Sequence, residues 1–127
     1  MPGWGDILAE IQAEQIRIQQ VQAQNPNDPA GRASAPNIVR HKYLKELSDY
    51  TNRNTIVYAS AWLQKSQVPA DFIVIHPSDM DGFLEVVKAS DTKKDLDLIL
   101  HSPGGSPAAA EQIINYLRQK FTRIRVV

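Results

Sequence analysis

Cysteine is absent from this chain of 127 residues. Its absence excludes disulfides, thiolate metal sites and a cysteine nucleophile. Long apolar runs are also missing: the clean ones, such as residues 72–75 and 98–100, are far shorter than the ~18–20 residues of a membrane span. The first six residues, Met-Pro-Gly-Trp-Gly-Asp, lack the basic and then apolar layout of a signal peptide. We therefore expect a soluble, cytoplasmic protein with no transmembrane segment.

Neither sign of charge is in excess, because 14 Lys and Arg residues balance 14 Asp and Glu residues. Proteins that bind nucleic acids or anionic membranes normally concentrate positive charge, so a nucleic-acid partner is not expected. The hydrophobic fraction of 43% and the charged fraction of 22% are ordinary for a globular protein. The length corresponds to about one domain of 100–150 residues.

The N-terminal part of the chain predicts one helix and a linker. Residues 1–24 have apolar side chains at helical spacing, which indicates an amphipathic helix. Two interpretations of this helix stay open: it covers its own domain, or it is an oligomerisation arm. Residues 25–37 contain three prolines and a glycine and little to bury, which predicts a linker.

Residues 38–127 predict an α/β domain. Short apolar or β-branched runs indicate four strands, at residues 55–58, 72–75, 96–101 and 124–127. Helices are expected between them. This alternation is typical of a mostly parallel sheet with right-handed crossover helices, covered on both faces.

Four helical segments are expected in the same domain. The first is expected to be capped by Asn37, and the second to begin at Ala61. The third is expected to be capped by Ser78 or Asp79, and the fourth to have Pro107 in its first turn. Ser78 with Asp81 has the spacing of a capping box. The segment from Ala61 is expected to form a single turn, and Ser106 is expected to cap the last helix.

The segment best suited to binding or catalysis is Ser102-Pro-Gly-Gly105, which lies between a predicted strand and a predicted helix. Two glycines permit positive φ angles and close approach by another backbone. Their N–H groups, beside a helix N-terminus, suit an anion such as a phosphate or the oxyanion of acyl transfer. The phosphate-loop pattern and G-x-G-x-x-G are both absent. The alternative that the glycines only turn the chain stays open.

A metal site is a weaker alternative. His76 and His101 end two predicted strands, and Asp79 and Asp81 lie close to the first of them in sequence. Their spacing matches no zinc or iron pattern, and the two carboxylates suit the start of a helix. No metal and no cofactor are therefore expected.

Several strings together resemble one known family. The string Leu96-Asp-Leu-Ile-Leu-His-Ser-Pro-Gly-Gly105 is followed by an Ala-rich helix and by Ile124-Arg-Val-Val127. The upstream strings that agree with it are residues 40–44, 51–58, 61–65 and 79–83. Over about residues 38–127 the chain resembles the serine dehydrogenase proteinase family. These are serine peptidases of the Clp-protease and crotonase fold, related to signal peptide peptidase A.

The resemblance implies a role for each glycine of the loop. Gly104 would supply one backbone N–H of an oxyanion hole, and Gly105 would keep the loop open for an extended polypeptide substrate. It also implies a cytoplasmic homo-oligomer without a cofactor. The nucleophilic serine of the family lies in an Ala-Met-Ser-Ala-Gly string that this chain lacks, and it would come after Val127.

We therefore expect this chain to be the N-terminal part of a serine endopeptidase and to be inactive alone. It would be a fragment, the product of a split gene or a degenerate copy. Two alternatives remain open. One is a non-catalytic scaffold or oligomer subunit. The other is a module of the crotonase type that binds acyl-CoA or phosphate.

Overall fold

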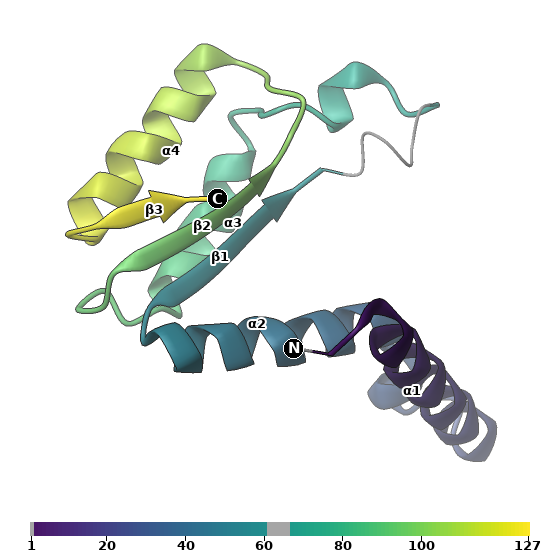
Figure 1. Cartoon of the computed structure of the whole chain (residues 1–127). Coiled ribbons are helices and arrows are strands. Elements are labelled where there is room, and N and C mark those ends of the chain that lie inside the picture. The colour runs from purple at the N-terminus through teal and green to yellow at the C-terminus, as the bar shows by residue number, and fades with distance from the viewer. Residues whose placement is uncertain (1, 61–66) are drawn as a thin grey trace. The chain divides into compact units, whose positions relative to one another are not determined.

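The computed structural model describes residues 2–60 and 67–127 (Figure 1). This part of the chain contains four α-helices and three strands, joined by loops and 3₁₀ turns. The chain divides into two units, Met1–Leu47 and Ser48–Val127. The helices and strands in order are α1 (Trp4–Gln24), α2 (Ala35–Thr51), β1 (Asn54–Ala59), α3 (Asp79–Lys88), β2 (Leu96–His101), α4 (Pro107–Lys120) and β3 (Ile124–Val126). None of these helices is long and apolar enough to cross a membrane.

The first unit contains α1, which confirms the predicted N-terminal helix. The Pro-rich segment after it contains a 3₁₀ turn at Pro29–Arg32, capped by the Asp28 carboxylate. Gly31 in this turn is buried, and a β-carbon there would lie 3.1 Å from the Cα of Gln22. The close approach of the turn to α1 therefore favours a glycine at this position.

The next helix begins earlier than predicted. The Ile38 N–H already donates to the Ser34 carbonyl at 3.0 Å, and α2 begins at Ala35. The predicted cap at Asn37 is therefore wrong. Pro36 explains the difference, because a proline in the first turn of a helix has no N–H group that would be left without a partner.

Helix α2 ends at Thr51, directly before Asn52. Asn52 has a φ of 52°, in the left-handed region that asparagine tolerates better than most residues. The turn closes through two bonds: the Arg53 N–H donates to the Ser48 carbonyl at 3.2 Å, and the Ser48 hydroxyl donates to the Arg53 carbonyl at 2.6 Å. Strand β1 follows directly.

The second unit is built on a parallel sheet in the order β1-β2-β3. Asn54 pairs with Leu96, and Leu96 pairs with Ile124. One helix lies in each connection, α3 between β1 and β2 and α4 between β2 and β3. The predicted α/β class, with a parallel sheet and crossover helices, is confirmed.

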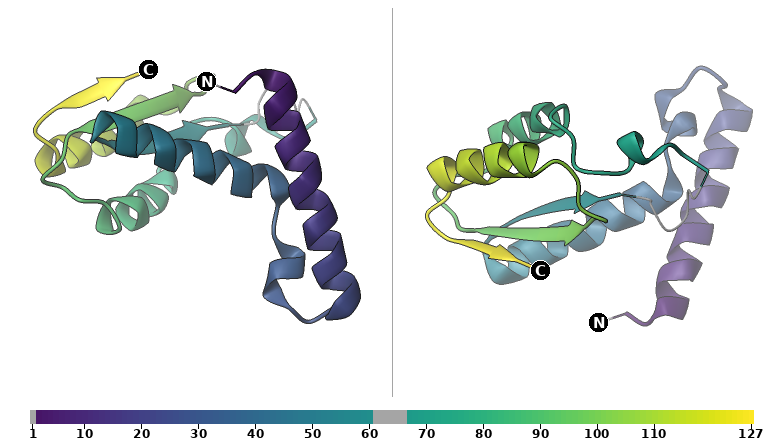
Figure 2. Two further views of the ribbon diagram at one scale, coloured as in Figure 1. Left: turned by 60° about the horizontal axis from the view of Figure 1, so that its bottom comes forward. Right: turned by 90° about the horizontal axis from the view of Figure 1, so that it is seen from above.

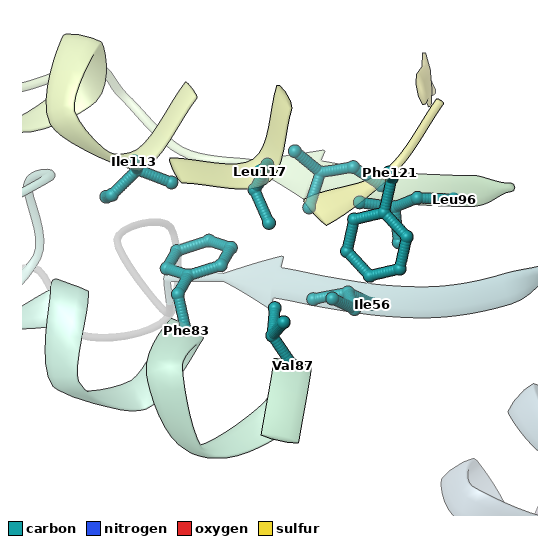
Figure 3. Close-up of a cluster of buried hydrophobic side chains, with 8 residues drawn as sticks. Ile56, Phe83, Val87, Leu96, Ile113, Leu117 and Phe121 are labelled. Atoms are coloured by element: carbon teal, nitrogen blue, oxygen red, sulfur yellow. The ribbon is translucent and has the colours of Figure 1, made fainter. Parts of the chain in front are cut away.

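Both crossover helices pack on the same face of the sheet (Figure 2). The strand order follows the chain order, and successive crossovers of one hand then place their helices on one face. The core between sheet and helices (Figure 3) consists of Ile56, Phe83, Val87, Leu96, Leu98, Ile113, Leu117 and Phe121. The sequence predicts cover on both faces, whereas α3 and α4 share one.

The predicted strand at residues 72–75 is wrong. Residues 70–72 form a 3₁₀ turn, Phe72 is 80% exposed, and only Ile75 makes an isolated bridge, to Gly105. Pro69 and Pro77 bracket this short run and cannot donate ladder hydrogen bonds. The predicted helical turn at residues 61–64 lies outside the described residues.

Candidate functional site

The loop after β2 lies where α/β sheets generally hold their ligands, at the carboxyl end of a parallel strand. Gly104 has a φ of 106° and Gly105 a φ of 155°, so both adopt backbone conformations that favour glycine. Helix α4 follows at once. Its cap is Ser106, as predicted, whose side chain accepts the Ala109 N–H at 3.3 Å.

Gly104 is held at both of its polar backbone groups. Its N–H donates to the Ser102 hydroxyl oxygen at 3.2 Å. Its carbonyl accepts the Ile75 N–H at 2.8 Å and the Ser102 hydroxyl at 3.2 Å. The predicted oxyanion donor is therefore directed at a side chain of its own loop.

Gly105 is held on one side only. On that side it forms a parallel bridge with Ile75, and the Ser106 N–H donates to the Ile75 carbonyl at 3.0 Å. A β-carbon on residue 105 would overlap the backbone of Ile75, lying 2.8 Å from its Cα and closer still to its N and O atoms. Only glycine fits here. The residue is exposed, and its N–H donates none of the hydrogen bonds found among the described residues.

The direction of the Gly105 N–H follows from the peptide group that it shares with Gly104. This peptide bond is trans, so its C=O and N–H point in opposite directions. The Gly104 carbonyl faces Ile75. The Gly105 N–H therefore points away from Ile75, close to the positive end of α4.

The start of α3 forms a second polar cluster. The Asp79 carboxylate accepts the His76 N–H at 2.9 Å and the Tyr58 hydroxyl at 2.8 Å. The Ser78 hydroxyl lies 2.9 Å from Nδ1 of His76 and caps no backbone N–H. The predicted capping box of Ser78 with Asp81 is therefore wrong. The equivalent contact lies two residues earlier, where the Asp79 carboxylate accepts the N–H of His76, three residues before it. Pro77 lies between these two residues, at the start of the turn.

Tyr58 is a functional candidate that the sequence did not reveal. Its ring stacks on Phe83 at a centroid distance of 5.8 Å. Burial and the hydrogen bond to Asp79 raise the pKa of Tyr58 to about 12. A shallow groove of about 290 Å³ lies beside it, lined by Ile56, Val57, Tyr58, Ser78, Asp79, Gly82, Phe83 and Val86. The only available signal is the position of Tyr58 on the same strand face as the buried Ile56.

The structure does not assemble the alternative metal site. Among the residues that it describes, no three His, Asp or Glu side chains come together in a way that could hold a metal ion. His76 is engaged with Ser78, whereas Nδ1 of His101 lies 3.3 Å from the Ser60 carbonyl. Of the four residues considered for this site, His76 and Asp79 meet only through a backbone hydrogen bond.

A buried ion-pair cluster lies on β2, and the sequence did not reveal it either. Asp97 is 2% exposed. Its carboxylate accepts from Nε of Arg53 at 2.6 Å and from Nε of Arg125 at 3.1 Å, and Arg53 also binds Asp95 at 2.9 Å. Burial raises the pKa of Asp97, but the hydrogen bonds from Arg125 and Arg53 outweigh it and hold that pKa below its ordinary value.

Comparison with known proteins finds a relative of this chain. The chain is 32% identical over 93 residues to an uncharacterized protein of Methanocaldococcus jannaschii, and the match covers 71% of this chain and 32% of that protein. The chain thus spans about a third of the length of the curated relative that it matches. No family model matches the sequence. No solved structure matches it.

Proposed function

We propose that the chain is the N-terminal part of a cytoplasmic serine endopeptidase of the serine dehydrogenase proteinase type, to which it contributes the oxyanion-hole loop. One observation carries the proposal. At the carboxyl end of β2, the N–H of an exposed glycine, Gly105, points away from the sheet bridge and makes no hydrogen bond within the described residues. A backbone N–H of this kind is what a developing oxyanion requires.

The geometry favours Gly105 over Gly104 as the donor. The resemblance assigns this role to Gly104, but the Gly104 N–H is occupied by the Ser102 hydroxyl. The Gly105 N–H needs no rearrangement to receive an acceptor. It also stands closer in the chain to the first turn of α4, where the helix dipole favours negative charge.

The chemistry of the loop is limited to binding. The sequence contains no Ala-Met-Ser-Ala-Gly string to supply the nucleophile. Acyl transfer needs a serine, a base that takes its proton and donors for the oxyanion. In our proposal the chain holds a polypeptide carbonyl through Gly105, within a homo-oligomer, and the nucleophile and the base come from a further segment.

A ligand comparison tests the proposal. The chain is titrated by calorimetry with an unstructured casein peptide, inorganic phosphate and acetyl-CoA, and a fluorophosphonate probe is used in parallel. We expect binding of the peptide and no labelled serine. Binding of phosphate or acetyl-CoA without peptide would contradict the proposal in favour of a module of the crotonase type. Binding of none of the three would favour a scaffold.

A further inference from the structure

We infer that Ser102 is a positioning residue, whose hydroxyl fixes the direction of the Gly105 N–H. This inference rests on the proposed function, since it names the residue that prepares the donor. Ser102 acts through the backbone of Gly104 and has no place in the chemistry itself.

The Ser102 hydroxyl bridges the two polar groups of Gly104. It accepts the Gly104 N–H at 3.2 Å and donates to the Gly104 carbonyl at 3.2 Å. Ser102 is half-buried, so these bonds are partly shielded from water. The side chain therefore closes a small ring over a glycine whose φ is 106°.

The Gly104 carbonyl is the group that matters for Gly105. It receives two donors, the Ile75 N–H at 2.8 Å and the Ser102 hydroxyl at 3.2 Å. A carbonyl oxygen has two lone pairs, and both are used here. Because this carbonyl and the Gly105 N–H belong to one trans peptide group, the two donors fix the N–H in the opposite direction.

Two consecutive glycines give this peptide group little restraint of their own, because glycine populates positive and negative φ about equally. Without Ser102, the Ile75 N–H would be the one remaining donor to the Gly104 carbonyl among the described residues. A rotated peptide would turn the Gly105 N–H toward the Ile75 N–H and place two donors face to face. It would also turn the Gly104 carbonyl outward, where it would repel an oxyanion. The Ser102 hydroxyl opposes this rotation at both ends of Gly104.

To hold Gly104 in this way, the side chain of residue 102 must be short and must donate one hydrogen bond and accept another at the same time. An alanine at residue 102 provides neither function. A threonine keeps the hydroxyl on the β-carbon, so Ser102→Thr is the conservative variant against which Ser102→Ala is compared.

Amide exchange of the ¹⁵N-labelled chain tests the inference. In Ser102→Ala we expect the Gly104 amide to exchange about five- to tenfold faster, the loss that corresponds to one ordinary hydrogen bond. We also expect the Gly105 amide signal to move, and both amides to return to wild-type behaviour in Ser102→Thr. Unchanged Gly104 and Gly105 amides in Ser102→Ala would overturn the inference. Urea unfolding curves confirm that each variant is folded.

Calorimetry with the casein peptide separates this inference from the proposed function. If both hold, Ser102→Ala binds the peptide about five- to tenfold more weakly than wild type, and Ser102→Thr restores the affinity. If the wild-type chain binds no peptide, the proposed function fails, and the amide exchange still decides whether Ser102 holds the loop. Equal peptide affinity of wild type and Ser102→Ala would contradict the positioning role.

Discussion

The backbone of Ile75 lies where the β-carbon of residue 105 would be, 2.8 Å from its Cα and closer still to its N and O atoms. This relationship explains why a glycine is needed at the mouth of the loop. Because residue 105 has no side chain, its backbone can form the bridge to Ile75. The Gly105 N–H then points to the opposite side, away from Ile75. The same contact joins the segment before α3 to the segment before α4.

The first prediction is that Gly105→Ala destabilises the protein by about 2–4 kcal/mol, through steric overlap with Ile75 and the positive φ. Urea unfolding measures the change. Gly82→Ala is the matched control, because a β-carbon there has open space within α3. It should leave stability unchanged or raise it by about 0.5–1 kcal/mol. Equal effects of the two substitutions would show that residue 105 is not packed against Ile75.

Gly104→Ala should have an intermediate effect. A β-carbon at residue 104 meets nothing within 4 Å, so its cost is the strain of a φ of 106° alone. This strain corresponds to about 1–2 kcal/mol. The same unfolding assay should therefore place Gly104→Ala between Gly82→Ala and Gly105→Ala. A Gly104→Ala protein as stable as wild type would mean that residue 104 adopts a negative φ.

The Asp97 cluster predicts a dependence of stability on pH. Asp97→Asn should cost about 2–3 kcal/mol at neutral pH, because it removes a buried partner of two arginines. Asp95→Asn is the control, since the Asp95 carboxylate pairs with Arg53 alone among the described residues and its side chain is 29% exposed. It should cost less than about 1 kcal/mol.

The sign of this pH effect follows from the depressed pKa of Asp97. The stabilisation by Asp97 is complete above the pKa of the unfolded chain, about 3.9, and is lost as the pH falls further. Unfolding curves measured from neutral pH downward should therefore converge for wild type and Asp97→Asn. A constant difference between the two proteins down to the lowest pH would contradict a charged Asp97 in the folded state.

Tyr58 should ionise late in an alkaline titration. Burial and the hydrogen bond to Asp79 raise its pKa to about 12. The raised pKa means that the stabilisation by Tyr58 is complete below the ordinary pKa of about 10 and is lost as the pH rises toward 12. The difference in ultraviolet absorbance between wild type and Tyr58→Phe isolates this phenol. A transition near pH 10 in that difference would show that Tyr58 is exposed and unpaired with Asp79.

The elements with a strong local signal could be predicted from sequence. Strand β2 has four apolar residues among its six, and α4 combines a serine cap, Pro107 and helical spacing. Residues 72–75 have an equally apolar pattern but no strand. Pairing depends on which sheet edge is available in the folded protein, and a local pattern does not contain that information.

The position of the site could be predicted, but its contacts could not. The Pro-Gly-Gly string after a strand identifies the loop. Which of its two glycines has an open N–H depends on Ser102 and on Ile75, and Ile75 is 30 residues distant along the chain. The ion pairs of Asp97 were missed for a similar reason: an aspartate between leucines in a strand suggests a solvent-facing position, and its arginines come from distant segments.

The most direct test of the central claim is a titration of the ¹⁵N-labelled chain with the unstructured casein peptide, followed through the glycine amides. If Gly105 is the donor, its amide should move most. The amides of Gly104, Gly82 and Gly31 should move little, because the first is bonded to Ser102 and the others lie in helical turns. Bound peptide that shifts Gly104 and leaves Gly105 unchanged, or that shifts neither, would contradict the assignment of the oxyanion donor.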